Sequence, residues 1–160
     1  MKAKYFAILS LVLWVITAGV ILRMFIMGST IKDQDGRQAI LLKPAERNLI
    51  LKEMRGMLGS VKGIVSAMRT EDSKAIAEAA RKSGMSAAVD VTPELFRKLP
   101  IEFKGRGMNL HKNFDALADE AEKGASRERI LELLDQQLSS CVACHSTYRL
   151  VPEGEASRGH

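Results

Sequence analysis

Two cysteines and a histidine near the C-terminal end carry the clearest chemical pattern of the chain, Cys141-x-x-Cys144-His145. Two thiols three residues apart, followed at once by an imidazole, form the attachment pattern of a c-type haem. Each thiol can add across one vinyl group of the porphyrin, and on a helical turn residues i and i+3 lie on one face. His145 can then present a ring nitrogen to the iron as an axial ligand. Cys141 and Cys144 are the only two cysteines, so this pattern explains both thiols.

Three other uses of the two thiols fit the sequence less well. A thioredoxin-like dithiol is expected after a strand in a βαβ unit, whereas the residues around Cys141 have a helical pattern. A zinc site needs about four ligands, and the other two histidines, His111 and His160, are distant in the sequence. A disulfide across two intervening residues would close a small, strained loop. One covalently bound haem c is therefore the predicted cofactor.

The N-terminal residues predict a membrane segment. Residues 5–22 contain no charge, and a helix of this length measures about 27 Å, close to the thickness of a hydrocarbon core. A cleaved signal peptide is the alternative, but its apolar region normally spans only about 7–15 residues. We expect a transmembrane signal-anchor over residues 1–28. Lys2 and Lys4 favour an N-terminus in the cytoplasm, which predicts a single-pass protein of the bacterial inner membrane with its C-terminal domain in the periplasm, where haem c matures.

The net charge does not indicate a nucleic-acid-binding protein. Three of the 24 basic residues, Lys2, Lys4 and Arg23, precede residue 28, where there is no acidic residue. Beyond residue 28 the remaining 21 basic residues face 19 acidic residues, and no basic stripe with interleaved aromatic residues is present. We therefore expect no nucleic acid among the partners.

The rest of the chain has a helical hydrophobic period. Residues 29–43 are expected to form a linker, with Ile40, Leu41 and Leu42 docking it on the domain. Apolar residues then recur at three- and four-residue steps, and Pro, Asp, Ser and Gly mark helix ends. The expected helices run over 44–68, from about 73 to Gly84, over a short turn between Thr92 and Pro100, from there to Gly124, and from Ser126 to about Tyr148. This pattern predicts an all-α protein with an antiparallel four-helix bundle over 44–150 and a flexible tail over 151–160, and cofactor sites in such bundles lie between facing helices.

Three glycines interrupt the first of these helices, Gly56, Gly59 and Gly63. Each costs about 1 kcal/mol relative to alanine in a helix. We therefore expect a close neighbour on this helix, and a flat macrocycle is one such neighbour.

With this organisation, residues 44–150 resemble class II c-type cytochromes, the cytochrome c′ and cytochrome c-556 group. The segment Cys141-Val-Ala-Cys144-His145-Ser-Thr-Tyr148-Arg149 is similar to the C-x-x-C-H-x-x-Y-R ending of that group. Weaker similarities lie at 47–52, 83–85 and 93–96. The link after Met85 is shorter than in typical members, and the membrane anchor is a departure from a mostly soluble group. Soluble relatives often pair through their first two helices, so a homodimer is a candidate assembly.

The resemblance also implies which residues surround the iron. In low-spin members a methionine four residues after the arginine of the first helix binds the distal face, and Leu51 stands at that place here. The resemblance therefore implies a five-coordinate, high-spin iron with His145 as its protein ligand and Leu51 as a steric gate. Met54 and Met57 are alternatives, although a methionine stripe is more often core. His111 is a candidate sixth ligand, against the simpler interpretation of a surface or propionate-bonded histidine.

Tyr148 and Arg149 follow the axial histidine by about one helical turn. Their family-like role is packing and charge control beside the histidine or a propionate. The simpler alternative is an ordinary aromatic and basic residue at a helix end, where a cation suits the dipole.

Three functions are compatible with these features, and none is catalysis on an organic substrate. The first is a monohaem electron carrier that exchanges single electrons with a membrane redox complex or with other cytochromes. The second is binding of NO or CO, for sensing or protection, which Leu51 favours. The third is an accessory subunit whose anchor packs into a larger membrane complex. We expect no enzyme activity, since no nucleophile–base pair and no paired carboxylates in an apolar setting are apparent.

Overall fold

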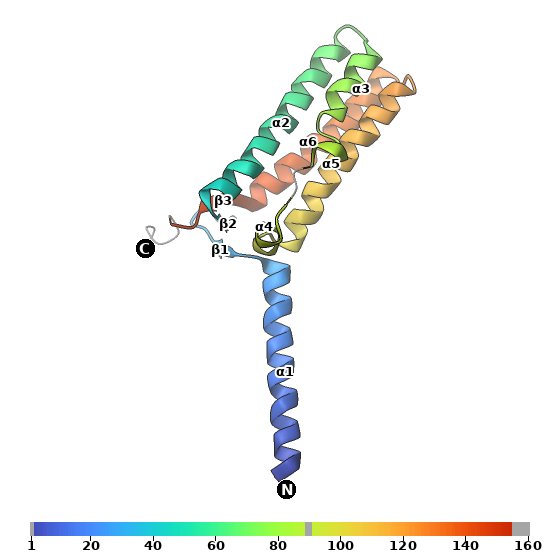
Figure 1. The fold of residues 1–160 in the computed structure, drawn as a ribbon. Helices are drawn as coiled ribbons and strands as arrows, with labels where there is room; N and C mark the ends of the chain where they lie inside the picture. Colours follow the sequence, from blue (N-terminus) through green and yellow to red (C-terminus); the bar gives the residue numbers. More distant parts are fainter. Residues whose placement is uncertain (1, 89–90, 155–160) are drawn as a thin grey trace.

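A computed structural model describes residues 2–88 and 91–154 of the protein. The described part is mostly helical, with six α-helices and one small sheet (Figure 1). The helices are α1 (Lys2–Met27), α2 (Pro44–Met68), α3 (Ser73–Arg81), α4 (Pro93–Lys98), α5 (Ile101–Glu122) and α6 (Arg127–Thr147). The remaining elements are β1 (Thr30–Lys32), β2 (Gln38–Leu42), β3 (Tyr148–Pro152) and a 3-10 turn η1 (Met85–Ala87). The prediction of a predominantly helical chain with one N-terminal apolar helix is confirmed.

Helix α1 projects away from the rest of the molecule (Figure 1). Lys4–Met27 is long and apolar enough to cross a membrane, and none of it is buried inside the protein. An isolated helix with apolar side chains on all sides is unstable in water, whereas the hydrocarbon core of a bilayer gives these side chains an apolar environment. The coarse prediction of a membrane-spanning segment is thus supported by length and composition.

Four helices share one hydrophobic core. Its fully buried members include Ile64 of α2, Ala80 of α3, Phe114 of α5 and Ile130 of α6. Local signals set the helix ends: the side chains of Asp72 and Ser126 accept from the backbone N–H groups of the third residue of α3 and α6. Gly124 ends α5 with a φ of 76°. The expected limits of α2, α5 and α6 are confirmed to within a few residues.

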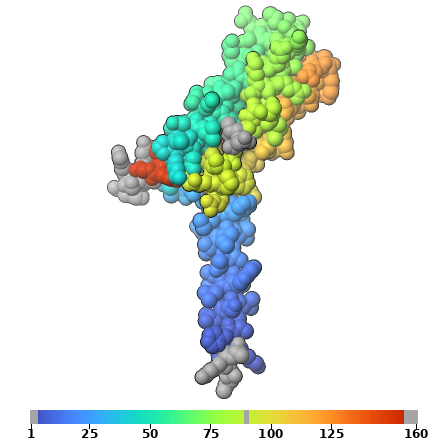
Figure 2. Space-filling view, in the orientation of Figure 1, coloured from blue at the N-terminus to red at the C-terminus, as the bar shows by residue number. Residues whose placement is uncertain are grey.

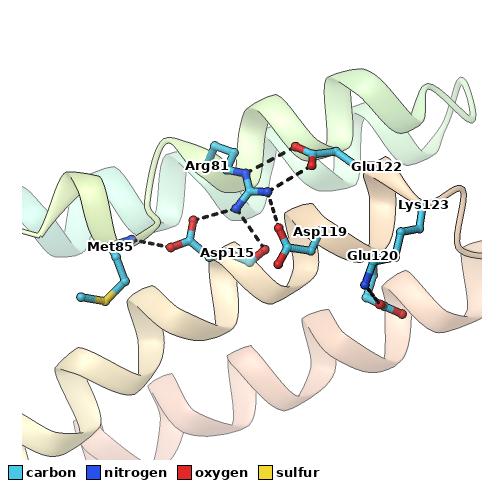
Figure 3. A network of polar contacts seen from close by, with 7 residues as sticks. All are labelled: Arg81, Met85, Asp115, Asp119, Glu120, Glu122 and Lys123. Atoms are coloured by element: carbon cyan, nitrogen blue, oxygen red, sulfur yellow. Dashed lines mark hydrogen bonds and ion pairs between the residues drawn. The ribbon is translucent and has the colours of Figure 1, made fainter.

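An arginine clamps α3 against α5 (Figure 3). The guanidinium of Arg81 donates to the carboxylates of Asp115, Asp119 and Glu122, which lie along one face of α5. Asp115 also accepts from the backbone N–H of Met85 at 2.8 Å. A Cβ atom at Gly84 would overlap the Asp115 carboxylate, so glycine permits this approach.

The glycines of α2 do not all mark a close approach. A Cβ atom on Gly63 would lie 2.9 Å from the Cβ of Ala79, so this glycine lets α3 pack tightly on α2. Open space surrounds Gly56 and Gly59. The expected close neighbour is therefore another helix, and only at Gly63.

A three-stranded sheet, which the sequence analysis did not predict, lies within the expected linker and at the end of α6. Strand β2 pairs antiparallel with β1 and parallel with β3, in the order β1-β2-β3. Gln38 lies opposite Tyr148 and Leu42 opposite Pro152. The expected docking of residues 40–42 is confirmed, because Ile40 and Leu42 are fully buried. The last helix ends at Thr147, so Tyr148 and Arg149 belong to β3 rather than to a helix.

The sheet contributes to a second hydrophobic cluster at the end of the domain nearest α1. Buried side chains from β2, α2, α4, the α4–α5 turn, α5, α6 and β3 form it: Ile40, Leu42, Ile50, Leu95, Leu99, Phe103, Cys144 and Tyr148. The predicted tail begins inside this structure, since Val151 is buried. Residues 155–160 of that predicted tail lie outside the described residues. The second cluster places the Cys-x-x-Cys-His segment against a packed core.

Candidate haem attachment site

A cavity of about 440 Å³ lies beside the C-terminal end of α6. Its volume falls within the range of small-molecule and cofactor sites, roughly 300–1,000 Å³. The lining side chains come from the loop before β2 and from α2, α5, α6 and β3: Arg37, Arg47, Leu51, Met54, Phe103, Cys144, His145, Tyr148, Arg149 and Leu150. Six of the seven predicted cofactor-binding residues meet in this cavity, although they are far apart in the sequence. The seventh, Cys141, lies one turn earlier on α6 and does not line it.

The two thiols differ in burial. Cys144 is buried in the second hydrophobic cluster and Cys141 is half-buried, and both are free cysteines. Burial raises the pKa of each thiol above its ordinary value. Both groups are therefore protonated thiols at neutral pH, which is the form that adds as S–H across a vinyl double bond.

His145 lies exposed in the last turn of α6, where a side chain from the loop before β2 binds the helix backbone. Its carbonyl accepts from Nη1 of Arg37 at 3.2 Å, and Arg37 pairs with Asp35 at 2.7 Å. The turn before β2 thus anchors the backbone of the predicted axial ligand. This contact, between residues 108 positions apart, could not be predicted from the sequence pattern.

Tyr148 closes one wall of the cavity. Its ring packs edge-on against Phe103, with ring centroids 5.5 Å apart, and only 5% of the residue is exposed. The phenol donates to Oε2 of Glu102 at 3.2 Å. Burial and this carboxylate raise the pKa of Tyr148, so its hydroxyl stays protonated. These contacts support the predicted packing role of Tyr148.

Three arginines line the cavity, and two of them bind aspartates. Arg149 pairs with Asp33 at 2.7 Å, and Arg37 pairs with Asp35. Arg47 donates its Nε–H to the carbonyl of Leu150 at 3.0 Å. Three guanidinium groups against two carboxylates leave a net positive lining, which suits a ligand that carries carboxylates.

Helix α2 faces the histidine end of α6 across the same cavity. Leu51 and Met54 line it, and both are half-buried. Met57 is instead part of the main helical core, in agreement with the simpler interpretation of the methionine stripe. Of the predicted alternative ligands, Met54 is thus the one that shares the cavity with His145.

His111 lies apart from this cavity. It is 4% exposed, its Nδ1 lies 2.8 Å from the carbonyl of Ser83, and its Nε2 lies 2.9 Å from Oε1 of Glu53. The bond to Glu53 has the largest effect and raises the pKa of His111, and the bond to Ser83 raises it further. Burial lowers the pKa, but the net direction is upward. His111 lines a different cavity of about 130 Å³, and Phe103 lines both cavities. A role for His111 as an iron ligand would require loss of the Glu53 bond.

The residues present fit a haem with two carboxylates. Cys144 and His145 line the cavity beside an apolar wall of Leu51, Met54 and Phe103 with arginines around it, and Cys141 lies one turn before His145 on the same helix. Arg37 and Phe103 are the residues that pattern analysis did not connect with the site. Phe103 lies within the helix expected between Pro100 and Gly124, whereas Arg37 lies in the expected linker.

Comparison of the chain with models of protein families, with curated proteins and with solved structures finds no match.

Proposed function

We propose that the protein is a membrane-anchored c-type cytochrome that carries single electrons. The observation that supports this most directly is the cavity in which Cys144 and His145 meet Leu51 and Met54 of α2. When bound, haem supplies a one-electron redox couple, while the protein supplies ligation, orientation and a dry environment.

Each group of side chains has a distinct part in holding the cofactor. Cys141 and Cys144 would hold the haem through two thioether links, and His145 would bind the iron through a ring nitrogen. Phe103 and Tyr148, packed edge-on, keep water from the inner wall. The cationic lining, of which Arg47 and Arg149 are part, binds the propionates.

The fold of residues 44–150 belongs to the same proposal. Helices α2, α3, α5 and α6 share one core, and α6 carries the attachment residues. We infer an antiparallel four-helix bundle of the cytochrome c′ and cytochrome c-556 type, extended by the sheet. The resemblance of the Cys141–Arg149 segment to that group supports this assignment.

The anchor places this carrier at a membrane. We propose that α1 spans the bacterial inner membrane once, with Lys2 and Lys4 in the cytoplasm and the domain in the periplasm. Strand β1 begins at Thr30, directly after α1, and β3 begins at Tyr148, directly after the attachment segment, with only β2 between them. Two strand spacings amount to about 10 Å. The attachment segment therefore lies near the strand that leaves α1, which favours a membrane redox complex as the partner.

Mass spectrometry of the purified protein tests attachment and anchoring together. We expect the mass of the full chain plus one haem, and a haem that remains with the protein after denaturation and acid–acetone extraction. Cys141→Ser and Cys144→Ser should each leave one thioether, and the double variant should lose covalent haem. Colourless extracted protein with two alkylatable thiols would disprove the attachment, and a chain lacking residues 1–28 would disprove the anchor.

A second candidate function is binding of NO or CO, which the leucine at position 51 favours. It requires that neither Met54 nor His111 occupy the sixth position. The absorption spectrum of the reduced protein should then shift when CO is added, and the Met54→Leu and His111→Ala variants should show the same spectrum as the original protein. A sharp low-spin spectrum that ignores CO would favour electron transfer, and its loss in Met54→Leu alone would identify that residue as the ligand.

A further inference from the structure

The end of α1 is bound directly to the turn between α4 and α5. Helix α1 ends at Met27, and Gly28 redirects the chain with a φ of 62°. The backbone N–H of Ser29 donates to the carbonyl of Lys98 at 2.8 Å, and a Cβ atom at Gly28 would overlap that carbonyl. The α4–α5 turn therefore lies where α1 enters the domain, as Figures 1 and 2 show.

Side chains strengthen the same junction. The rings of Phe25 on α1 and Phe96 on α4 have centroids 6.2 Å apart. Nζ of Lys104 lies 4.5 Å from the Phe25 centroid and 4.0 Å from the Phe96 centroid, and it donates to the Phe96 carbonyl. A cation against two aromatic faces is a favourable contact when partly desolvated. These contacts join α4 and α5 to the C-terminal end of α1.

Large apolar and basic side chains surround this junction and face outward. Ile31, Phe96 and Ile101 are 41%, 42% and 46% exposed, and Lys32 and Arg97 are exposed beside them in the sequence. We name these five residues the collar. Single exposed apolar residues are ordinary on a protein surface, but Ile31 follows the end of the apolar helix by four residues, and Phe96 and Ile101 flank the turn that is bound to that end.

The acidic residues nearest the collar in the sequence are already bound to basic ones. Asp33 pairs with Arg149 at 2.7 Å, Glu94 pairs with Lys43 at 2.7 Å, and Glu102 pairs with Arg106 at 2.6 Å. The collar therefore presents a positive charge next to its apolar side chains. Apolar side chains at the acyl boundary and cations at the phosphate level are the pattern of a surface that binds anionic lipid.

We propose that the collar binds the headgroup region of an anionic phospholipid bilayer and seats the domain against the membrane. Ile31, Phe96 and Ile101 enter the boundary between headgroups and acyl chains, and Lys32 and Arg97 contact lipid phosphates. The proposal requires that α1 spans the bilayer, and it does not depend on haem attachment. Seating would hold the attachment end of the domain at the membrane surface, since β3 and β1 belong to one sheet.

Photocrosslinking of the full chain in vesicles tests this surface. The photoreactive residue p-benzoylphenylalanine replaces Phe96, Ile101 or, as a control, Leu58, which is 67% exposed on α2. A fourth variant carries it at Trp14, as a positive control for insertion of α1. Vesicles contain phosphatidylcholine alone or with about one third phosphatidylglycerol, and intact mass identifies the adducts.

We expect phospholipid adducts from positions 14, 96 and 101, none from position 58, and a preference for phosphatidylglycerol at 96 and 101. Lys32→Glu and Arg97→Glu should each lower that preference about fivefold. Adducts at position 14 without adducts at 96 or 101, or adducts there to a second protein chain, would overturn the seating proposal and leave the anchor intact. No adduct at position 14 would overturn both.

Discussion

The bond between His111 and Glu53 joins α5 to α2 between the two hydrophobic clusters. His111 is almost fully buried, and its pKa lies above the ordinary value of 6.5 because Glu53 and the Ser83 carbonyl both bind the ring. The group thus binds its proton more tightly in the folded than in the unfolded protein. Its contribution to stability is complete below pH 6.5 and is lost as the pH rises through the folded pKa.

We therefore predict that the free energy of unfolding contains a component that falls as the pH rises from about 6.5. Glu53→Gln should remove most of this component, because the amide keeps a hydrogen-bond partner without the charge. Chemical denaturation at a series of pH values measures it. An equal pH dependence in the variant would show that other groups are responsible.

Gly84 is a residue at which the addition of a single methyl group should lower stability. A Cβ atom there would overlap the Asp115 carboxylate, which binds Arg81 and the Met85 N–H (Figure 3). We predict that Gly84→Ala lowers the free energy of unfolding by about 1–3 kcal/mol.

The matched control for this substitution is Gly59→Ala, also an addition of one methyl group. Gly59 lies within α2 with open space around it. This change should raise the free energy of unfolding by about 0.5–1 kcal/mol, since alanine favours a helix. The same sign for both variants in denaturant unfolding would contradict the proposed overlap at Gly84.

At the scale of elements, β2 joins the strand that follows α1 to the strand that follows the Cys-x-x-Cys-His segment. It pairs with β1 on one side and β3 on the other, and its Leu42 is fully buried. We predict that Leu42→Ala lowers the free energy of unfolding by about 2–5 kcal/mol, because it leaves a cavity in the second hydrophobic cluster.

Leu58→Ala removes the same atoms from an exposed position and serves as the control for Leu42→Ala. Its effect on unfolding should stay within about 0.5 kcal/mol. If the two variants unfold at the same denaturant concentration, β2 is not part of the cooperative core.

At the scale of the whole molecule, α1 stands apart from a domain that is otherwise compact (Figure 2). Leu13 lies in the middle of α1 and is 56% exposed within the protein. A lysine at the middle of a spanning helix costs about 2.5–3.5 kcal/mol of insertion free energy. We predict that Leu13→Lys shifts protein from the membrane pellet to the supernatant in alkaline carbonate extraction. Leu13→Ala should remain in the pellet, and equal retention of both variants would argue that α1 does not span.

Much of the architecture could be predicted from local signals. The limits of α2, α5 and α6 follow from Pro44, Gly124 and Ser126, because helix caps act over a few residues. The Cys-x-x-Cys-His spacing likewise predicts haem attachment from local signals, since that chemistry depends on the spacing within a single turn, and attachment stays a prediction. The apolar character of α1 was apparent from composition alone.

The sheet was not predictable in this way. Residues 38–42 are a short apolar run without alternation, which is equally compatible with a strand, a helix end or a docked linker. Its identity as a strand depends on parallel pairing with residues 148–152, more than 100 positions away. The same pairing ends α6 at Thr147 and moves Tyr148 and Arg149 into a strand.

The chain by itself therefore specifies the thiols, the imidazole and the apolar N-terminal helix, because each depends on residue type and short-range spacing. Only the folded molecule brings Arg37, Leu51 and Phe103 to the cavity beside His145, and only it buries His111 between Glu53 and Ser83. Such contacts arise from packing between elements distant in the sequence, where many partners are sterically possible and the shared hydrophobic clusters select one arrangement.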